Sequence, residues 1–298
     1  MRIAFNTSLR NAQTDLAGLA EQLAARQREV TSGKRVHTAS QDPAAAQAAV
    51  GEHAEIGALD HYVKTANAVT SRLTIVDTVV ADLVDRVTQA SALLTSAQGS
   101  VLSTMQREAL AGELRGIRDA IYTGMTTQFR GTYLFAGTDS TTPPYARNPD
   151  GSITAYQGNA DAASVDVDRQ TAIQTTFNGD DVLRGGAARD VFATLEDMIA
   201  AVTANDSAAM AAGSAELTAA FDRVIRMQSR VGTDLAQLDQ KRLTLETAMR
   251  AAQSRLSMQE DANMVESISG MTAAETAYRA ALGATSTIGR MSLLDYLR

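Results

Sequence analysis

The sequence contains no cysteine and no tryptophan, only four prolines, and aromatic residues make up 4% of its 298 residues. The absence of cysteine excludes disulfides, thiolate metal sites and cysteine nucleophiles. Because aromatic side chains are so few, a deep aromatic-lined pocket of the kind that binds small molecules is not expected. The many alanine, leucine, valine, glutamine and methionine residues instead favour long helices packed side by side.

An excess of positive charge and a long apolar run are also missing. The net charge is −7, whereas a nucleic-acid-binding protein needs a dense basic face to replace phosphate counterions. No uncharged apolar segment approaches the roughly 20 residues that span a bilayer. The amino end MRIAFNTSLRNAQ lacks the apolar core of a cleaved secretion signal. We therefore expect no nucleic acid partner, no membrane insertion, and any export to proceed without a cleaved signal peptide.

Motifs for catalysis and metal binding are absent too. His37, His53 and His61 stand in none of the serine-hydrolase, zinc-protease or dinucleotide-binding motifs. The eight-residue separation of the last two does not place them on one helix face as metal ligands. The aspartates of residues 161–168 lack the ligand order of a calcium loop. We expect no enzymatic activity, no cofactor and no metal.

Apolar residues at both chain ends follow the periodicity of helices that pack against other helices. The amino-terminal heptad stripe consists of Leu9, Leu16, Leu23 and Val30, with Phe5, Ala12 and Leu19 at its complementary positions. The carboxyl-terminal segment carries its large apolar side chains on one side, namely Met264, Ile268, Met271, Tyr278 and Leu282. It ends in GRMSLLDYLR, which adds Leu293, Leu294 and Leu297. Both ends are therefore expected to be amphipathic helices whose apolar sides need a partner.

Two longer stripes predict long interior helices. Over residues 73–101 and again over 217–256, apolar residues alternate spacings of three and four. Only Gln228 and Arg242 interrupt the second stripe. Helices of this length must lie against other long helices.

Helical periodicity stops over residues 131–189. Short alternating or β-branched pieces, TYLFAG, SITAYQ, SVDVD and AIQTTF, are separated by turns rich in proline, glycine and asparagine. Residues 137–190 contain eight aspartates and four arginines. We expect a small, acidic, β-rich insertion that faces solvent.

The segment TSGKRVHTASQDPAAAQAAV, residues 31–50, contains the glycine–lysine pair of a phosphate-binding loop. However, Arg28 and Arg35 replace the first glycine and the final Ser or Thr of that motif. A glycine after an apolar stripe is a helix stop, and Asp-Pro is a helix start. The candidate hinge residues between two helices are Gly33, Lys34, Arg35, Asp42 and Pro43.

The expected fold is mainly α: a long, coiled-coil-like helical bundle formed by the amino- and carboxyl-terminal halves, with a small β-rich inserted domain. Terminal helices over residues 1–42 and 262–298 are expected to form an inner assembly core. Residues 43–130 and 190–261 are expected to form a long-helix rod domain, and residues 131–189 an outer insertion.

The stretch from FNTSLRNAQ to QDPAAAQAAV resembles the terminal helix and S-G-x-R connector of the bacterial flagellins and their hook-associated relatives. Flagellins usually continue with Asp-Asp-Ala-Ala-Gly, whereas this chain has QDPAA at residues 41–45, a form similar to the hook–filament junction branch. GTYLFAGTDSTTPPY, YQGN and the carboxyl end MSLLDYLR resemble the same branch. By these motifs the chain is identified as a member of the flagellin family.

The resemblance implies a structural adaptor, located outside the cell at the hook–filament junction, that assembles through polymerising terminal helices. Paired terminal helices would line the inner core of a tube, and the insertion would face outward. The implied partners are copies of the same chain, a hook-side junction protein, a filament-side flagellin or junction protein, an export chaperone and the flagellar type III export apparatus.

The candidate assembly residues are the large apolar side chains of both ends: Phe5, Leu9, Leu16, Leu19, Leu23, Val30, Met264, Ile268, Met271, Tyr278, Leu282, Leu293, Leu294 and Leu297. Two other functions remain open, a filament-forming flagellin and a cytoplasmic coiled-coil signalling module. The signalling module would close its heptads within a soluble dimer with ordered ends.

Overall fold

The computed structural model describes residues 2–98 and 102–296, and for residues 2–6, 8–9 and 288–296 it describes the helical backbone alone. The described chain is mainly helical with four short strands, which confirms the expected fold class. It divides into two compact units, a terminal unit of residues 1–59 and 247–298 and a central unit of residues 60–246. No helix in the described parts is long and apolar enough to cross a membrane.

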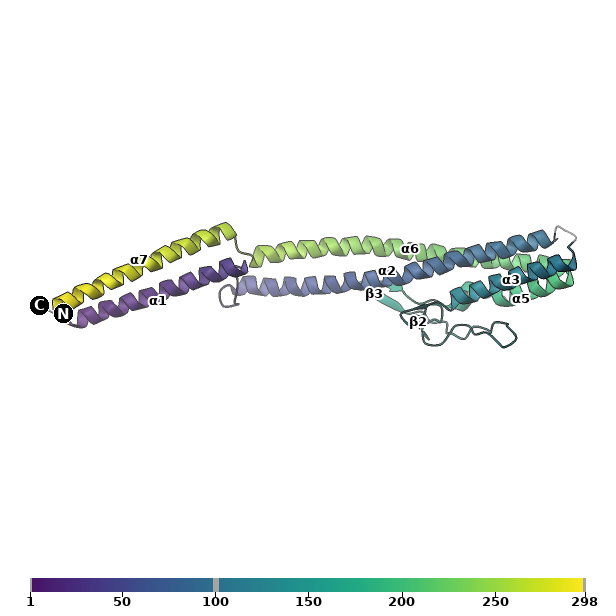
Figure 1. The fold of residues 1–298 in the computed structure, drawn as a ribbon, viewed down its shortest axis with the longest axis horizontal. Coiled ribbons are helices and arrows are strands. Elements are labelled where there is room, and N and C mark those ends of the chain that lie inside the picture. Colours follow the sequence, from purple (N-terminus) through teal and green to yellow (C-terminus); the bar gives the residue numbers. More distant parts are fainter. Residues whose placement is uncertain (1, 99–101, 297–298) are drawn as a thin grey trace. The chain divides into compact units, whose positions relative to one another are not determined.

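The terminal unit contains two long helices from opposite ends of the chain. Helices α1 (Arg2–Ser32) and α7 (Met264–Tyr296) lie side by side, purple and yellow in Figure 1. The unit also holds the start of α2 (Pro43–Gln98) and the end of α6 (Ser207–Glu260). Arg255 of α6 joins these two segments, with its Nε 2.8 Å from Glu52 Oε1 and its Nη2 3.1 Å from Glu55 Oε2.

The central unit is built around the heptad stripes of α2 and α6. The stripe of α2 is fully buried as predicted: Leu73, Val76, Val80, Leu83, Val87, Ala90, Leu94 and Ala97. Val101, the last residue of the predicted stripe, lies outside the described residues. On α6, Leu217, Val224, Val231 and Leu238 are buried in the same core. The period of three and four therefore identified the sides that these helices bury.

The first segment of the predicted rod domain, residues 43–130, contains two helices. Helix α2 ends at Gln98, and α3 spans Thr104–Met125 and packs against α5 (Val191–Ala204). Ser103 begins α3 with a reciprocal cap, because its Oγ accepts from Gln106 N at 3.3 Å while Gln106 Oε1 accepts from Ser103 N at 2.9 Å. This Ser-x-x-Gln pattern is a helix start that the sequence displays.

The segment predicted to be a β-rich insertion has little regular structure. Its neighbourhood contains two antiparallel hairpins, β1 (Gln128–Phe129) with β2 (Thr132–Tyr133) and β3 (Ser164–Asp168) with β4 (Thr171–Gln174). A short helix, α4 (Gly179–Leu183), follows. The piece SITAYQ forms only one isolated bridge, between Ile153 and Arg147.

The same segment does not simply face solvent, which corrects the sequence interpretation. Phe135, Tyr145, Phe177 and Leu183 are at most 2% exposed and belong to the core that α2, α3 and α6 share. Phe135 and Phe177 stand in pieces predicted as strands, but their side chains belong to a core formed largely by helices. Residues 131–189 are thus part of the compact central unit.

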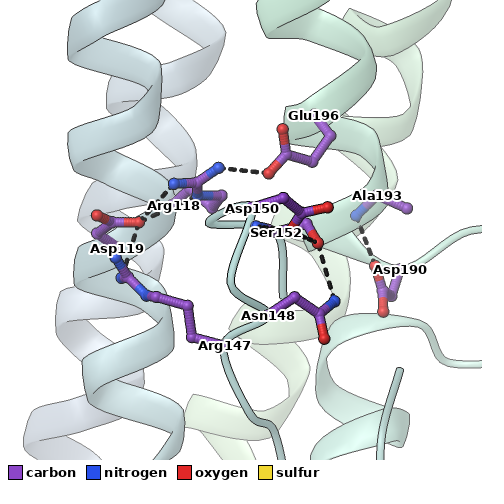
Figure 2. Close-up of polar contacts among 9 residues, drawn as sticks. All are labelled: Arg118, Asp119, Arg147, Asn148, Asp150, Ser152, Asp190, Ala193 and Glu196. Atoms are coloured by element: carbon purple, nitrogen blue, oxygen red, sulfur yellow. Dashed lines mark hydrogen bonds and ion pairs between the residues drawn. The ribbon is translucent and has the colours of Figure 1, made fainter. Parts of the chain in front are cut away.

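Polar contacts also tie the segment to the helices (Figure 2). Arg118 of α3 is buried and bonds to Glu196 of α5 and to Asp119, the latter at 2.9 Å. Burial lowers the pKa of Arg118, but the carboxylates of Glu196 and Asp119 outweigh burial and leave that pKa raised. Asp119 also accepts from Arg147 of the segment, with Nη2 and Oδ1 3.0 Å apart. One aspartate therefore links α3 to the loop after Tyr145.

Candidate assembly interface

The amino-terminal stripe is the more protected side of α1. Leu16, Leu19, Leu23 and Val30 are half-buried, whereas most residues between them are exposed. On α7, Ser267 is buried and Met271 and Tyr278 are half-buried. At Gly270 an added Cβ would lie 3.5 Å from Arg26 Nε, so α1 side chains reach the α7 backbone there. Two helices alone bury their stripes only in part.

Three of the predicted residues on α7 are more exposed than Met271 and Tyr278. Met264, Ile268 and Leu282 are 42%, 47% and 42% exposed, and the neighbouring Val265 is 81% exposed. Met264 is seven residues before Met271 and Leu282 is four after Tyr278, so both lie on the predicted apolar side of α7, and Ile268 and Val265 continue that side toward solvent. We call Met264, Val265, Ile268 and Leu282 the α7 flank. Sequence periodicity gives the apolar side of α7 but not how far each residue on that side is covered.

Some predicted assembly residues cannot be placed. The side chains of Phe5, Leu9, Leu293 and Leu294 are not among those described, and Leu297 lies outside the described residues. Their assignment to the interface remains a prediction.

The predicted helix stop and helix start at the hinge are confirmed. Gly33 has a φ of +69° and its N–H donates to Glu29 O at 2.9 Å, which is how a glycine ends a helix. Asp42 Oδ1 accepts from Ala45 N at 3.0 Å, and Pro43 is the first residue of α2. The Ala45 amide and the Arg35 guanidinium lower the pKa of Asp42.

The hinge residues are bonded to the second connector, residues 261–263. Arg35 N donates to Glu260 O at 2.7 Å, and Ala262 N donates to Gly33 O at 2.8 Å. Lys34 and Asp261 form an antiparallel bridge. The Arg35 side chain adds a bond from Nη2 to Gln259 O at 3.0 Å and an ion pair with Asp42 at 3.2 Å. The two connectors therefore form one bonded structure.

Glu260, which sequence reasoning missed, is the centre of this structure. Its Oε2 lies 2.6 Å from Lys34 Nζ and its Oε1 lies 3.0 Å from His53 Nε2. Lys34, and less strongly His53, lower the pKa of Glu260, while the Glu260 carboxylate raises the pKa of Lys34. We call Lys34, His53 and Glu260 the Glu260 clasp. No sequence signal could pair residues separated by more than 200 positions.

Clusters of possible metal ligands are absent from the described part of the chain. Among the described residues no group of three or more His, Asp and Glu side chains could hold a metal ion. His53 is exposed and bonds only to the Glu260 carboxylate in the contacts described.

Residues 3–140 match the model of the bacterial flagellin N-terminal helical region. Flagellar hook-associated protein 3 of Escherichia coli K12 is 24% identical over 234 residues, which cover 71% of this chain and 73% of that protein. Flagellar hook-associated protein 3 of Salmonella typhimurium LT2 is 23% identical over 255 residues, 78% of this chain and 77% of that protein.

Structural comparison gives the same fold. A solved structure of Xanthomonas campestris FlgL superimposes with a TM-score of 0.60 and 19% identity, over 68% of this chain and 98% of that one. The buried stripe of α2 and the capped connector at Asp42 both lie within residues 3–140, the part of the chain that the family model matches. Over residues 3–140 this chain is therefore similar to the bacterial flagellins, and over most of its length it is similar to flagellar hook-associated protein 3.

Proposed function

We propose that this chain is a structural component of the bacterial flagellum that joins the hook to the filament by polymerising through its terminal helices. The names of its relatives, hook-associated protein 3, support the junction role. The observation that carries the proposal is the α7 flank, a set of large apolar side chains left exposed beside a half-buried helix pair.

The α7 flank needs a further helix to cover it. Full burial of one large apolar side chain stabilises an assembly by about 1.5 to 3 kcal/mol. A single copy of the chain leaves Val265 81% exposed and Ile268 47% exposed, so most of this energy is available only on assembly. The occupants we propose are the terminal helices of neighbouring copies.

The junction role places the chain outside the cell, between a hook-side junction protein and a filament-side flagellin or junction protein. Delivery through the flagellar type III export apparatus, with an export chaperone, belongs to this proposal. A non-catalytic role is supported by the relatives, which are structural flagellar proteins.

The test is Val265→Asp in cells that lack the native chain. The folded monomer should be unaffected, because the residue is exposed and a carboxylate in the first turn of α7 suits the helix dipole. On assembly the variant would bury an unpaired charge, so electron microscopy should show hooks without filaments. Filament subunits should accumulate in the medium.

Met105→Asp is the matched control, because Met105 is 80% exposed and lies in the first turn of α3 in the central unit. It should support normal filaments. Normal filaments in Val265→Asp cells would contradict the proposal. If the chain were itself the filament subunit, the protein released into the medium would be the Val265→Asp chain and not a different filament protein.

A further inference from the structure

A basic pocket lies on the central unit, outside the terminal helices. Arg223, Arg226 and Arg230 recur at spacings of three and four along α6, which places them on one helix face. With Met227 and the end of α4 they line an open hollow of about 340 Å³. Asp181 is the one acidic residue that lines it. The pocket therefore carries three positive charges against one negative charge, on a chain of net charge −7.

The innermost guanidinium is held in place by the backbone that follows α4. Arg223 Nη2 donates to Leu183 O at 3.0 Å. Gly185 has a φ of +55°, and a Cβ there would lie 2.4 Å from Arg223 Cδ. Only glycine fits this close approach, so the Arg223 side chain packs directly against the backbone of the turn at Gly185.

Arg223 nevertheless retains an unused donor. Its Nε is buried and has no hydrogen-bond partner among the described residues. Burial lowers the pKa of Arg223, Glu216 opposes this, and the charge of Arg226 lowers it further. A desolvated cation beside a second cation is unfavourable until an anion neutralises both.

No carboxylate within the described chain neutralises the three arginines. None of them is in an ion pair of 4.0 Å or less in the described residues, although Arg230 donates to the Gln174 side-chain amide. The nearby Arg184 is occupied by Asp180, with Nη2 and Oδ2 2.5 Å apart. Asp234 on the same helix forms no ion pair with the three arginines among the described residues, and burial raises its pKa against the charge of Arg230.

We propose that Arg223, Arg226 and Arg230 form an oxyanion site that binds a carboxylate or a phosphate-type group. Guanidinium groups donate in a planar fork that matches both anions. The oxyanion comes either from an acidic side chain of a neighbouring copy or from a free anion. The site does not depend on the junction role, because binding is a property of the folded chain.

The test titrates the full-length protein with sodium phosphate, and separately with sodium acetate, at an ionic strength held constant with sodium chloride. The Nε–Hε resonances of Arg223 and Arg226 in NMR spectra should shift and saturate. Arg226→Gln, at an exposed helical position, should weaken the apparent affinity about tenfold, the effect of losing one charge-assisted hydrogen bond.

Arg115→Gln is the matched control, since it removes the same charge from an exposed position on α3. It should bind as the wild type does. Chemical shifts that never saturate would overturn the proposal, because they would show nonspecific charge screening and not a binding site. An equal loss of affinity in Arg226→Gln and Arg115→Gln would overturn it for the same reason. If Arg226→Gln cells also lose their filaments, the natural oxyanion is a neighbour's carboxylate. Normal filaments together with loss of binding identify a free anion.

Discussion

At the scale of single residues, Glu260 shows how one carboxylate can fix a hinge. It accepts from Lys34 in the first connector and lies within hydrogen-bond distance of His53 in α2, while its backbone carbonyl accepts from Arg35. Exposed ion pairs contribute little individually, but pairs that share one acceptor and hold two backbone bonds act together. Together, the contacts of Glu260 hold the two connectors against each other, and they thereby fix the points at which α1 ends and α7 begins.

Lys34→Gln should move the pKa of Glu260 up toward its ordinary value of 4.5, because the Lys34 ammonium is the main cause of the depression. NMR titration of the Glu260 side chain measures this directly. Glu21→Gln, which removes an exposed charge elsewhere on α1, is the control and should leave the Glu260 titration unchanged. An unshifted Glu260 in Lys34→Gln would mean that the clasp is open in solution.

The same pKa shifts define a pH window for the connectors. The folded pKa of Glu260 is lowered, so its stabilising contribution is present above pH 4.5 and is lost as the pH falls through the folded value. The folded pKa of Lys34 is raised, so its contribution is present below pH 10.5 and is lost as the pH rises through the folded value. The ion pair between Lys34 and Glu260 is therefore intact throughout the neutral range.

At the scale of elements, the end of α1 depends on one left-handed residue. Gly33→Ala should destabilise the terminal unit by about 1 to 2 kcal/mol, because φ of +69° strains any residue with a Cβ. No neighbour lies within 4 Å, so the effect is conformational and not a clash. Hydrogen exchange of the Arg35 and Ala262 amides, which bond across the connectors, measures it.

Gly57→Ala is the matched control for that experiment. Gly57 also lies in the terminal unit with no neighbour within 4 Å, but it is inside α2. Alanine there should stabilise the helix by about 0.5 to 1 kcal/mol. Slower exchange in Gly33→Ala than in the wild type would show that the hinge is not held in the described conformation.

These elements also show what the sequence could and could not predict. The stop at Gly33, the start at Asp42–Pro43 and the stripe of α2 depend on residues near each other in the chain, and all three are confirmed. The Glu260 clasp joins residues more than 200 positions apart, so nothing local signals it. The capping box at Ser103 and Gln106 is also a local signal, because the two residues are three positions apart in the chain.

At the scale of the whole molecule, the central unit has one core to which residues distant in the sequence contribute. Phe135, Tyr145 and Phe177 pack in the same cluster as Leu83 of α2 and Val224 of α6. Strand propensity predicted the pieces that contain Phe135 and Phe177, but it gave no indication that helices would cover these side chains. A segment that supplies core residues cannot be treated as a separable outer module.

Tyr145 tests this view of the core. It is fully buried, with its ring centroid 5.0 Å from that of Phe192 in α5 and 5.5 Å from that of Tyr156. Burial, and then the carboxylates of Asp190 and Asp180, raise the pKa of its hydroxyl. Tyr145→Ala should cost about 3 to 5 kcal/mol of unfolding free energy, as truncation of a large buried aromatic does.

Tyr145→Phe separates packing from polarity at the same position. The Tyr145 hydroxyl is buried and has no hydrogen-bond partner among the described residues, so its removal should leave stability unchanged or raise it by about 1 kcal/mol. Urea unfolding followed by circular dichroism gives both values. If Tyr145→Ala unfolded at the wild-type midpoint, the loop around Tyr145 would be separable from the helices, and changes in it could be made without affecting the central unit. A large loss of unfolding free energy in Tyr145→Phe would instead show that the hydroxyl bonds to a bound water. Tyr145→Phe removes only the hydroxyl, so such a loss can come only from a broken hydrogen bond.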